Sequence, residues 1–255
     1  MKKTLKSVFY IGCILILYEI ASKIVNKSLF LPSLGELVKM FGNLFETNVF
    51  FKHLGSSFLR VTTGVLIASA VSIPLGMAIA WYKPVRTIFK PIVDSLRNIP
   101  PTCFSPILVL ILGIDESMKI TYVAIAVAFS FLPTVIQTCM DPAEKLKETA
   151  YTMGFNYNRM LLHCFIPYIT PSLIKSIILS YSVGWTYVIL AEVNNTQYGL
   201  GHLMYIGSAR GKMAMVFASM IIIVVVGIVF DKVANEIVNK AFAWRFSDEK
   251  QSAAG

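Results

Sequence analysis

Long apolar runs alternate with short polar segments along most of the chain. Five of these runs are long enough to cross a bilayer as a helix, which takes about 20 residues. Their approximate ranges are 8–25, 58–81, 117–138, 171–191 and 213–233. The runs predict membrane-spanning helices, because in lipid every backbone polar group must find its partner inside the protein.

A sixth apolar segment, 87–113, is interrupted by prolines and polar residues. The apolar part after Pro101 is only about 12 residues, or about 18 Å at the rise of a helix, which is too short to cross alone. The part before Pro101 must then enter the membrane too, as one half of a broken span. Non-helical backbone at that depth has to be buried in protein or line a wet cavity, and such breaks often mark a transport path. The candidate pathway residues are Arg97, Asn98, Pro100 and Pro101, with Trp185 of the fifth run.

Arg97 has two interpretations. Its guanidinium could attract an anionic solute in the pathway, or it could pair with Asp94, which lies three residues earlier on the same helix face. Trp185 likewise could line the pathway, or it could pack in the bundle and anchor it at the interface. The sequence leaves both questions open.

Composition supports an integral membrane protein. The 255-residue chain is 56% hydrophobic and 15% charged, whereas soluble domains carry roughly 25% charged residues. The net charge of +9 comes from basic residues at the ends of the apolar runs, which is typical of membrane topology and not of nucleic-acid binding. We expect one all-α membrane domain, 1–255, with about six spans and both termini in the cytoplasm. Segment 26–55 would lie in the outer interface, in contact with lipid, and 234–255 would form a cytoplasmic tail.

Catalytic motifs are absent from the sequence. It has no G-x-x-x-x-G-K-[ST] loop to hold ATP phosphates, and its histidines and cysteines lack metal-ligand spacing. We therefore expect no catalytic residue, metal or cofactor in this chain.

The polar segment 141–168 has the features of a small cytoplasmic docking element. Asp141 and Pro142 suit the start of a helix, and Gly154 suits its end. Pro167 would end a second short helix. Apolar residues recur at helical spacing on one face. The candidate docking residues are Ala143, Glu144, Leu146, Lys147, Glu148, Ala150, Gly154 and Pro167.

This segment resembles the EAA signature of ATP-binding-cassette importer permeases. Glu148, Ala150, Gly154 and Pro167 match it, whereas Thr149, Cys164 and Ile166 are mild departures. The run 94–101 and Gly199–Gly201, which follows Glu192, are similar to the nitrate/sulfonate/taurine class of these permeases.

The resemblance implies a type I importer permease with a cytoplasmic coupling helix. It implies a homodimer that works with separate ATPase subunits, which bind ATP and Mg, and with an extracytoplasmic solute-binding protein. Glu192, Asn194 and Asn195 would contact that binding protein, or they would lie in a solvated loop. The solute would be small and anionic, such as a sulfonate, taurine or nitrate, although a neutral vitamin precursor also suits the class.

Two other functions are open at this point. An ATP-independent secondary transporter or channel would not need the docking segment. A membrane-embedded enzyme would need several polar residues at one depth, and only Asp94, Arg97 and Asn98 are available together.

Overall fold

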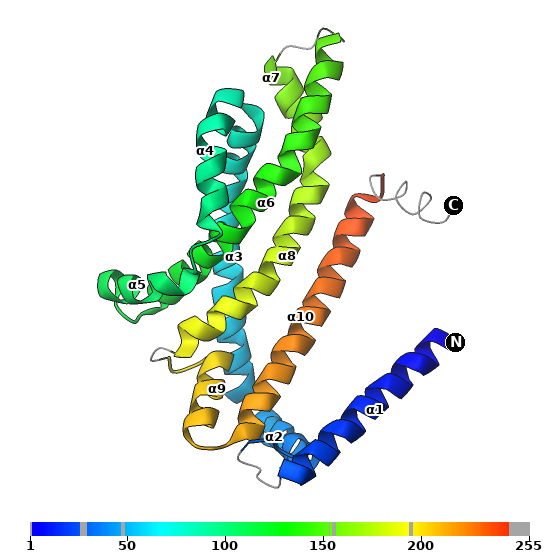
Figure 1. The fold of residues 1–255 in the computed structure, drawn as a ribbon, viewed down its shortest axis with the longest axis vertical. Coiled ribbons are helices and arrows are strands. Elements are labelled where there is room, and N and C mark those ends of the chain that lie inside the picture. The colour runs from blue at the N-terminus through cyan, green and yellow to red at the C-terminus, as the bar shows by residue number, and fades with distance from the viewer. Residues whose placement is uncertain are drawn as a thin grey trace. The chain divides into compact units, whose positions relative to one another are not determined.

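The structure is a computed structural model of the chain, and it describes residues 2–25, 30–46, 49–152, 154, 157–193 and 196–244. The described part is helical throughout, which confirms the predicted fold class (Figure 1). Its helices are α1 (Lys2–Val25), α2 (Leu34–Glu46), α3 (Val49–Trp81), α4 (Lys83–Leu96), η1 (Pro101–Phe104), α5 (Ser105–Leu112), α6 (Glu116–Thr152), α7 (Tyr157–Met160), η2 (Leu161–Phe165), α8 (Ile166–Val193), α9 (Leu200–Ala209) and α10 (Met213–Ala241).

Four helices of the described part are long and apolar enough to cross a membrane: α3, α6, α8 and α10. A fifth span is possible if α4 and the η1–α5 segment count as one, although they meet at an angle of 87°. The first apolar run forms α1, and its role as a span stays a prediction.

The spanning helices extend past the apolar runs that predicted them. α3 begins at Val49, before the run at 58–81, and α10 continues to Ala241, past the run that ends at 233. A hydropathy run marks the part of a helix that suits lipid. It does not mark the helix end, because polar residues with good helix propensity continue the hydrogen-bond ladder. Residues 245–255 of the predicted tail lie outside the described part.

The chain divides into two compact units. The first comprises Met1–Ser57 and Glu192–Val225, and the second comprises Phe58–Ala191 and Val226–Gly255. In the first unit the end of α1 holds the start of α2. Leu34 N–H donates to Glu19 Oε2 at 3.0 Å, and Ser33 and Glu36 form a reciprocal capping box.

In the second unit, α3 packs closely on α6. Small residues recur every fourth position along α3, at Gly64, Ala68, Ser72, Gly76 and Ala80. A Cβ added to Gly64 would lie 2.6 Å from Val123 Cγ1, and one added to Gly76 would lie 2.5 Å from Val135 Cγ1. The two helices are therefore closer than a side chain at Gly64 or Gly76 would allow, as expected for small residues at a membrane helix interface.

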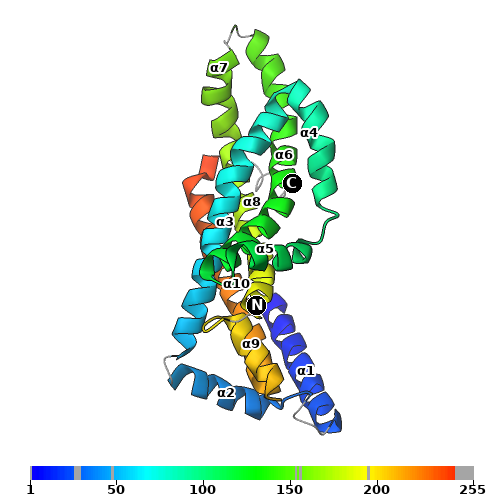
Figure 2. The ribbon, with the colours of Figure 1, turned by 90° about the vertical axis from the view of Figure 1, so that its left-hand side faces the viewer.

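The broken span packs against the same pair of helices. Val93 of α4 lies in one buried cluster with Ile79 of α3 and Ile136 of α6. Leu108 of α5 lies in another, with Tyr122 of α6. α4 and α5 are thus both fixed on α6, with the break between them next to that helix (Figure 2).

Candidate translocation site

The break between α4 and α5 is set by the two prolines. Pro100 has φ −62° and ψ 123°, an extended conformation, because a residue that precedes proline is disfavoured in the helical region. Neither proline has an N–H to continue the α4 ladder. The chain therefore leaves α4 at Leu96 and resumes as the short helix η1 at Pro101. This confirms the broken helix predicted from the sequence.

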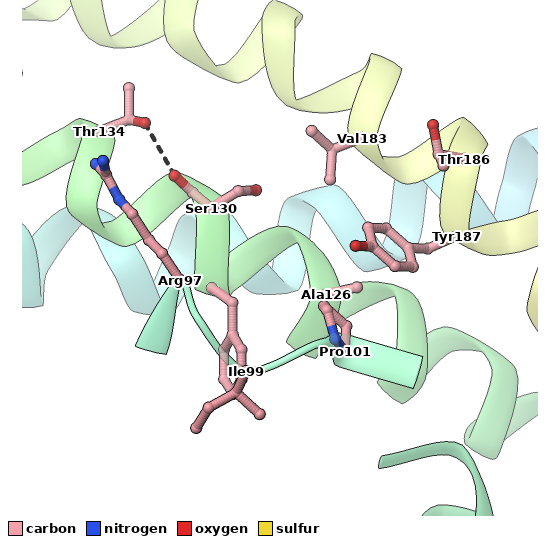
Figure 3. Close-up of a pocket in the computed structure, with 10 residues that line it drawn as sticks. Arg97, Ile99, Pro101, Ala126, Ser130, Thr134, Val183, Thr186 and Tyr187 are labelled. Carbon is pink, nitrogen blue, oxygen red and sulfur yellow. Dashed lines mark hydrogen bonds between the residues drawn. The ribbon is translucent and has the colours of Figure 1, made fainter. Parts of the chain in front are cut away.

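A cavity of about 420 Å³ lies at this break, within the second unit. Its lining comes from the break, from α6 and from α8 (Figure 3). The lining residues are Arg97, Ile99, Pro101, Ala126, Phe129, Ser130, Thr134, Val183, Thr186 and Tyr187. One cation and four hydroxyl groups thus share a pocket that is otherwise apolar. Sites for small molecules typically combine an apolar wall with a few polar groups in this way.

Arg97 does not pair with Asp94. Asp94 Oδ2 instead lies 2.6 Å from Lys90 Nζ, four residues earlier on α4. No hydrogen bond or ion pair joins the Arg97 side chain to the described part of the chain, and the residue is exposed. Figure 3 shows its guanidinium on the side of the pocket where Thr134 lies. The structural ion pair considered from the sequence is therefore not formed.

The other predicted pathway residues fall into two groups. Pro101 lines the pocket, whereas Asn98 and Pro100 are exposed residues outside its lining. Trp185 is 4% exposed and packs against Phe58, with ring centroids 6.4 Å apart. Trp185 is therefore not part of this pocket's lining, and its contact with Phe58 is the bundle packing that the sequence analysis gave as the alternative.

The sequence analysis missed most of the pocket. Ser130 and Thr134 lie four residues apart on α6, so they share one face. Polar hydroxyl residues at helical spacing inside an apolar run were a signal that could have identified this face. Thr186 and Val183 on α8 had no such signal, because which face of α8 meets the break depends on tertiary packing.

The predicted docking segment forms the ends of two long helices. α6 runs unbroken from Glu116 to Thr152, so the prediction that Asp141 and Pro142 begin a separate helix is wrong. One proline costs a helix one hydrogen bond and bends it, and a long helix that is stabilised on both sides can continue through it. Gly154 has φ +73°, which confirms the predicted glycine at the end of this helix.

Pro167 does not end a helix either. It is the second residue of α8, which follows α7 and η2 directly. η2 is a π-helix, and its wider turn bonds residue i to residue i+5. That turn accommodates a proline, which has no N–H to donate to the residue four positions before it.

The docking segment is fixed to the body of the second unit by aromatic packing. Phe165 is 0% exposed and Trp81 is 1% exposed, and their ring centroids lie 4.6 Å apart. This contact joins the end of η2 to the end of α3. The side chains of 141–152 lie outside the described part, so the individual docking residues remain predictions.

Glu192, one of the three residues predicted to contact a binding protein, is buried. Glu192 is 0% exposed and accepts hydrogen bonds inside the first unit, so a direct contact with a soluble partner is not assigned to it. Asn194 and Asn195 lie outside the described residues. Among the residues that the structure describes, no three His, Cys, Asp or Glu side chains gather as a metal site.

The chain matches one protein family and several named relatives. Residues 72–242 match the family model for the inner membrane component of binding-protein-dependent transport systems. A putative ABC transporter permease protein of Methanocaldococcus jannaschii is 29% identical over 90% of this chain and 88% of its own length. A putative aliphatic sulfonates transport permease protein of Bacillus subtilis is 26% identical over 86% and 79%. The formylaminopyrimidine transport permease protein of Halalkalibacterium halodurans is 22% identical over 95% and 97%.

The fold is similar to that of a solved transporter. A chain of the inward-facing MetNI methionine ABC transporter aligns with a TM-score of 0.65, covering 76% of this chain and 96% of that one. The sequence identity is 16%, so this likeness concerns the fold alone.

Proposed function

Because the chain belongs to the family of inner membrane components of binding-protein-dependent transport systems, we propose that it carries a small anionic solute through the pocket at the α4–α5 break. As a family member, it is the multi-pass permease subunit of an ABC importer, and ATP hydrolysis belongs to a separate subunit. This sets aside the ATP-independent transporter and the membrane enzyme. The identity of the solute and the residues that contact it form the proposal.

The Arg97 guanidinium, which has no hydrogen-bond or ion-pair partner among the described residues, is the observation that carries this proposal. A cation in a membrane-spanning segment is costly and usually finds a partner, yet Asp94 is taken by Lys90 at 2.6 Å. The guanidinium can donate several hydrogen bonds in a planar fork, which suits a carboxylate, sulfonate or nitrate. The hydroxyls of Ser130, Thr134 and Thr186 donate to backbone carbonyls of their own helices, so each would have to turn away from its carbonyl to donate to an anion. An anion entering the pocket would therefore supply the charge that Arg97 lacks.

The coupling to ATP would pass through the docking segment. In this account, 141–168 lies in the cytoplasm and contacts an ATPase subunit, which carries the ATP and Mg. Pushing on this segment would move α3 and α8, since Phe165 and Trp81 are packed together without exposure to solvent. A second copy of the chain would complete the pathway, both termini would be cytoplasmic, and a binding protein would deliver the solute on the other side.

A neutral solute is the second candidate. It is favoured by the similarity to the formylaminopyrimidine permease, which extends over 95% of this chain. The pocket's apolar walls and hydroxyls would also suit a neutral heterocycle. The two candidates differ in how they use Arg97, because only an anion gains a charge-assisted bond there.

The test is uptake by the complete transporter, with its own ATPase and binding protein, in liposomes. Taurine, butanesulfonate, nitrate and formylaminopyrimidine serve as probes, each with ATP inside. We expect ATP-dependent uptake of one of the anions. Uptake of formylaminopyrimidine alone would replace the anionic proposal with the neutral one.

A further inference from the structure

The first turn of α9 is held by side chains from two other helices. The first N–H groups of a helix have no partner within it. Here Gly199 N–H donates to His53 Nδ1 at 2.9 Å, Leu200 N–H to Ser57 Oγ at 2.8 Å and Gly201 N–H to Glu192 Oε2 at 2.8 Å. Three successive backbone donors are thus satisfied from outside the helix.

We call these three side chains the α9 clasp, and two of them also bind each other. Ser57 Oγ donates to the Glu192 carboxylate, at 2.8 Å from Oε1 and 2.9 Å from Oε2. His53 and Ser57 lie four residues apart on α3, so they share one face. Glu192 comes from the end of α8. The clasp therefore ties α3, α8 and the start of α9 together within the first unit.

The clasp is buried and closely fitted. His53 is 4% exposed, and Ser57 and Glu192 are 0% exposed. A carboxylate in such a place needs hydrogen bonds to be tolerated, and the positive end of a helix dipole favours it. Gly199 has φ +152°, and a Cβ there would meet the Glu192 carboxyl group, so only glycine fits. The close fit therefore needs both the Glu192 carboxylate and a glycine at position 199.

α3 and α8 each extend away from the clasp as one unbroken helix. α3 runs to Trp81 and α8 begins at Ile166, and these ends meet through the Trp81–Phe165 contact beside the docking segment. A displacement of α9 would therefore act on two helices that both lead to that segment.

We propose that Glu192 is a positioning residue that transmits docking of the binding protein on the loop Thr196–Gly201 and α9 to α3 and α8. This inference rests on the proposed function, in which that loop faces the outside. Glu192 acts from inside the protein, since its side chain is buried. It fixes the start of α9 to the two helices, so that the loop and the helix ends move together.

The experiment uses the complete permease–ATPase complex in nanodiscs, with three variants. Glu192→Ala removes the carboxylate. Ser57→Ala removes only the hydroxyl, which keeps the test valid if the first variant folds poorly. Glu46→Ala is the matched control, because Glu46 is an exposed acid at the end of α2 in the same unit. Amide hydrogen exchange over 196–209 and the ratio of ATPase rates with and without the binding protein are measured.

In the wild type we expect slow exchange over 196–201 and an ATPase rate that rises when the binding protein is added. Glu192→Ala should speed this exchange by about tenfold or more, since a charge-assisted hydrogen bond is lost, and should bring the ATPase ratio close to one. Ser57→Ala should change both in the same direction by less. Glu46→Ala should match the wild type. A merely structural role would lower both ATPase rates together and leave their ratio unchanged.

Wild-type exchange in Glu192→Ala and Ser57→Ala, or faster exchange with an unchanged ATPase ratio, would overturn the inference. A wild-type permease that fails to bind the ATPase would instead contradict the proposed function, so the two failures are distinguishable.

Discussion

Arg60 and Glu116 form a two-point ion pair between α3 and α6. Arg60 Nε lies 2.6 Å from Glu116 Oε2, and Nη2 lies 2.7 Å from Oε1. Lys119 Nζ joins the same carboxylate at 3.0 Å. Arg60 and Lys119 are both 4% exposed, whereas the Glu116 side chain is 58% exposed, so a carboxylate open to solvent pairs with two buried cations.

The first prediction concerns this cluster. Glu116→Gln should destabilise the permease by about 1–2 kcal/mol, because it removes the ion pairs to two buried cations while solvent screens the exposed carboxylate. Lys119→Met should cost less, since the Arg60–Glu116 pair remains intact and the methionine fills a similar volume. Thermal unfolding of the purified permease in detergent compares the two. An equal or smaller loss for Glu116→Gln would contradict the importance of this carboxylate.

The second prediction concerns the small-residue stripe of α3. Gly64→Ala should reduce stability by about 1–3 kcal/mol, because its Cβ would overlap Val123 and force the helices apart. Gly227→Ala is the matched control. No atom lies within 4 Å of a Cβ built at Gly227, and alanine is the better helix former, so this change should be neutral or stabilising by up to about 1 kcal/mol. Similar unfolding temperatures for both variants would show that α3 and α6 are not in close contact.

The third prediction concerns Arg97. Arg97→Gln should raise the KM for the anionic solute by about tenfold or more, as loss of a charged hydrogen bond implies, with the assembled complex intact. Arg97→Lys should keep part of the affinity, since it keeps the charge but not the planar fork. Lys83→Gln is the control, because Lys83 is an exposed cation of α4 that lies outside the pocket lining and leaves the Lys90–Asp94 pair intact. Uptake kinetics in liposomes give the comparison, and an unchanged KM in Arg97→Gln would exclude the proposed anion contact.

The sequence predicted the fold better than the site. Apolar runs located α3, α6, α8 and α10, because burial in lipid demands long stretches of apolar side chains. The pair Pro100–Pro101 located the break, because a proline lacks the N–H that would continue a helix and disfavours a helical conformation at the residue before it. The ends of the helices were harder to predict from the sequence. Pro142 lies inside α6 and Pro167 at the start of α8, because neighbouring turns compensate for the hydrogen bond that a proline cannot make.

The contacts of the two sites depend on residues far apart in the chain. Ser57 and Glu192 are separated by 135 positions, and no local pattern in the sequence pairs them. Arg97 illustrates the same limit at short range. By spacing, Asp94 was a possible partner of Arg97, yet it pairs with Lys90. Only side-chain geometry decides which of the two neighbouring cations Asp94 binds.

The fourth prediction addresses the docking segment. Glu148→Arg should abolish co-purification of the ATPase while membrane insertion stays normal, since the resemblance places this acid at the contact with that subunit. Gly154→Leu should have the same effect, because φ +73° strains a branched side chain by about 1–2 kcal/mol. Gly154→Asn should be tolerated, because asparagine adopts this conformation more readily.

Co-purification of the ATPase with Glu148→Arg and with Glu236→Arg is the most direct test of the account, because it asks whether segment 141–168 couples this permease to its motor. Glu236 is an exposed acid on α10, outside that segment. We expect the Glu236→Arg permease to retain the ATPase and the Glu148→Arg permease to lose it. Equal recovery of the ATPase with both variants would contradict the coupling role of this segment.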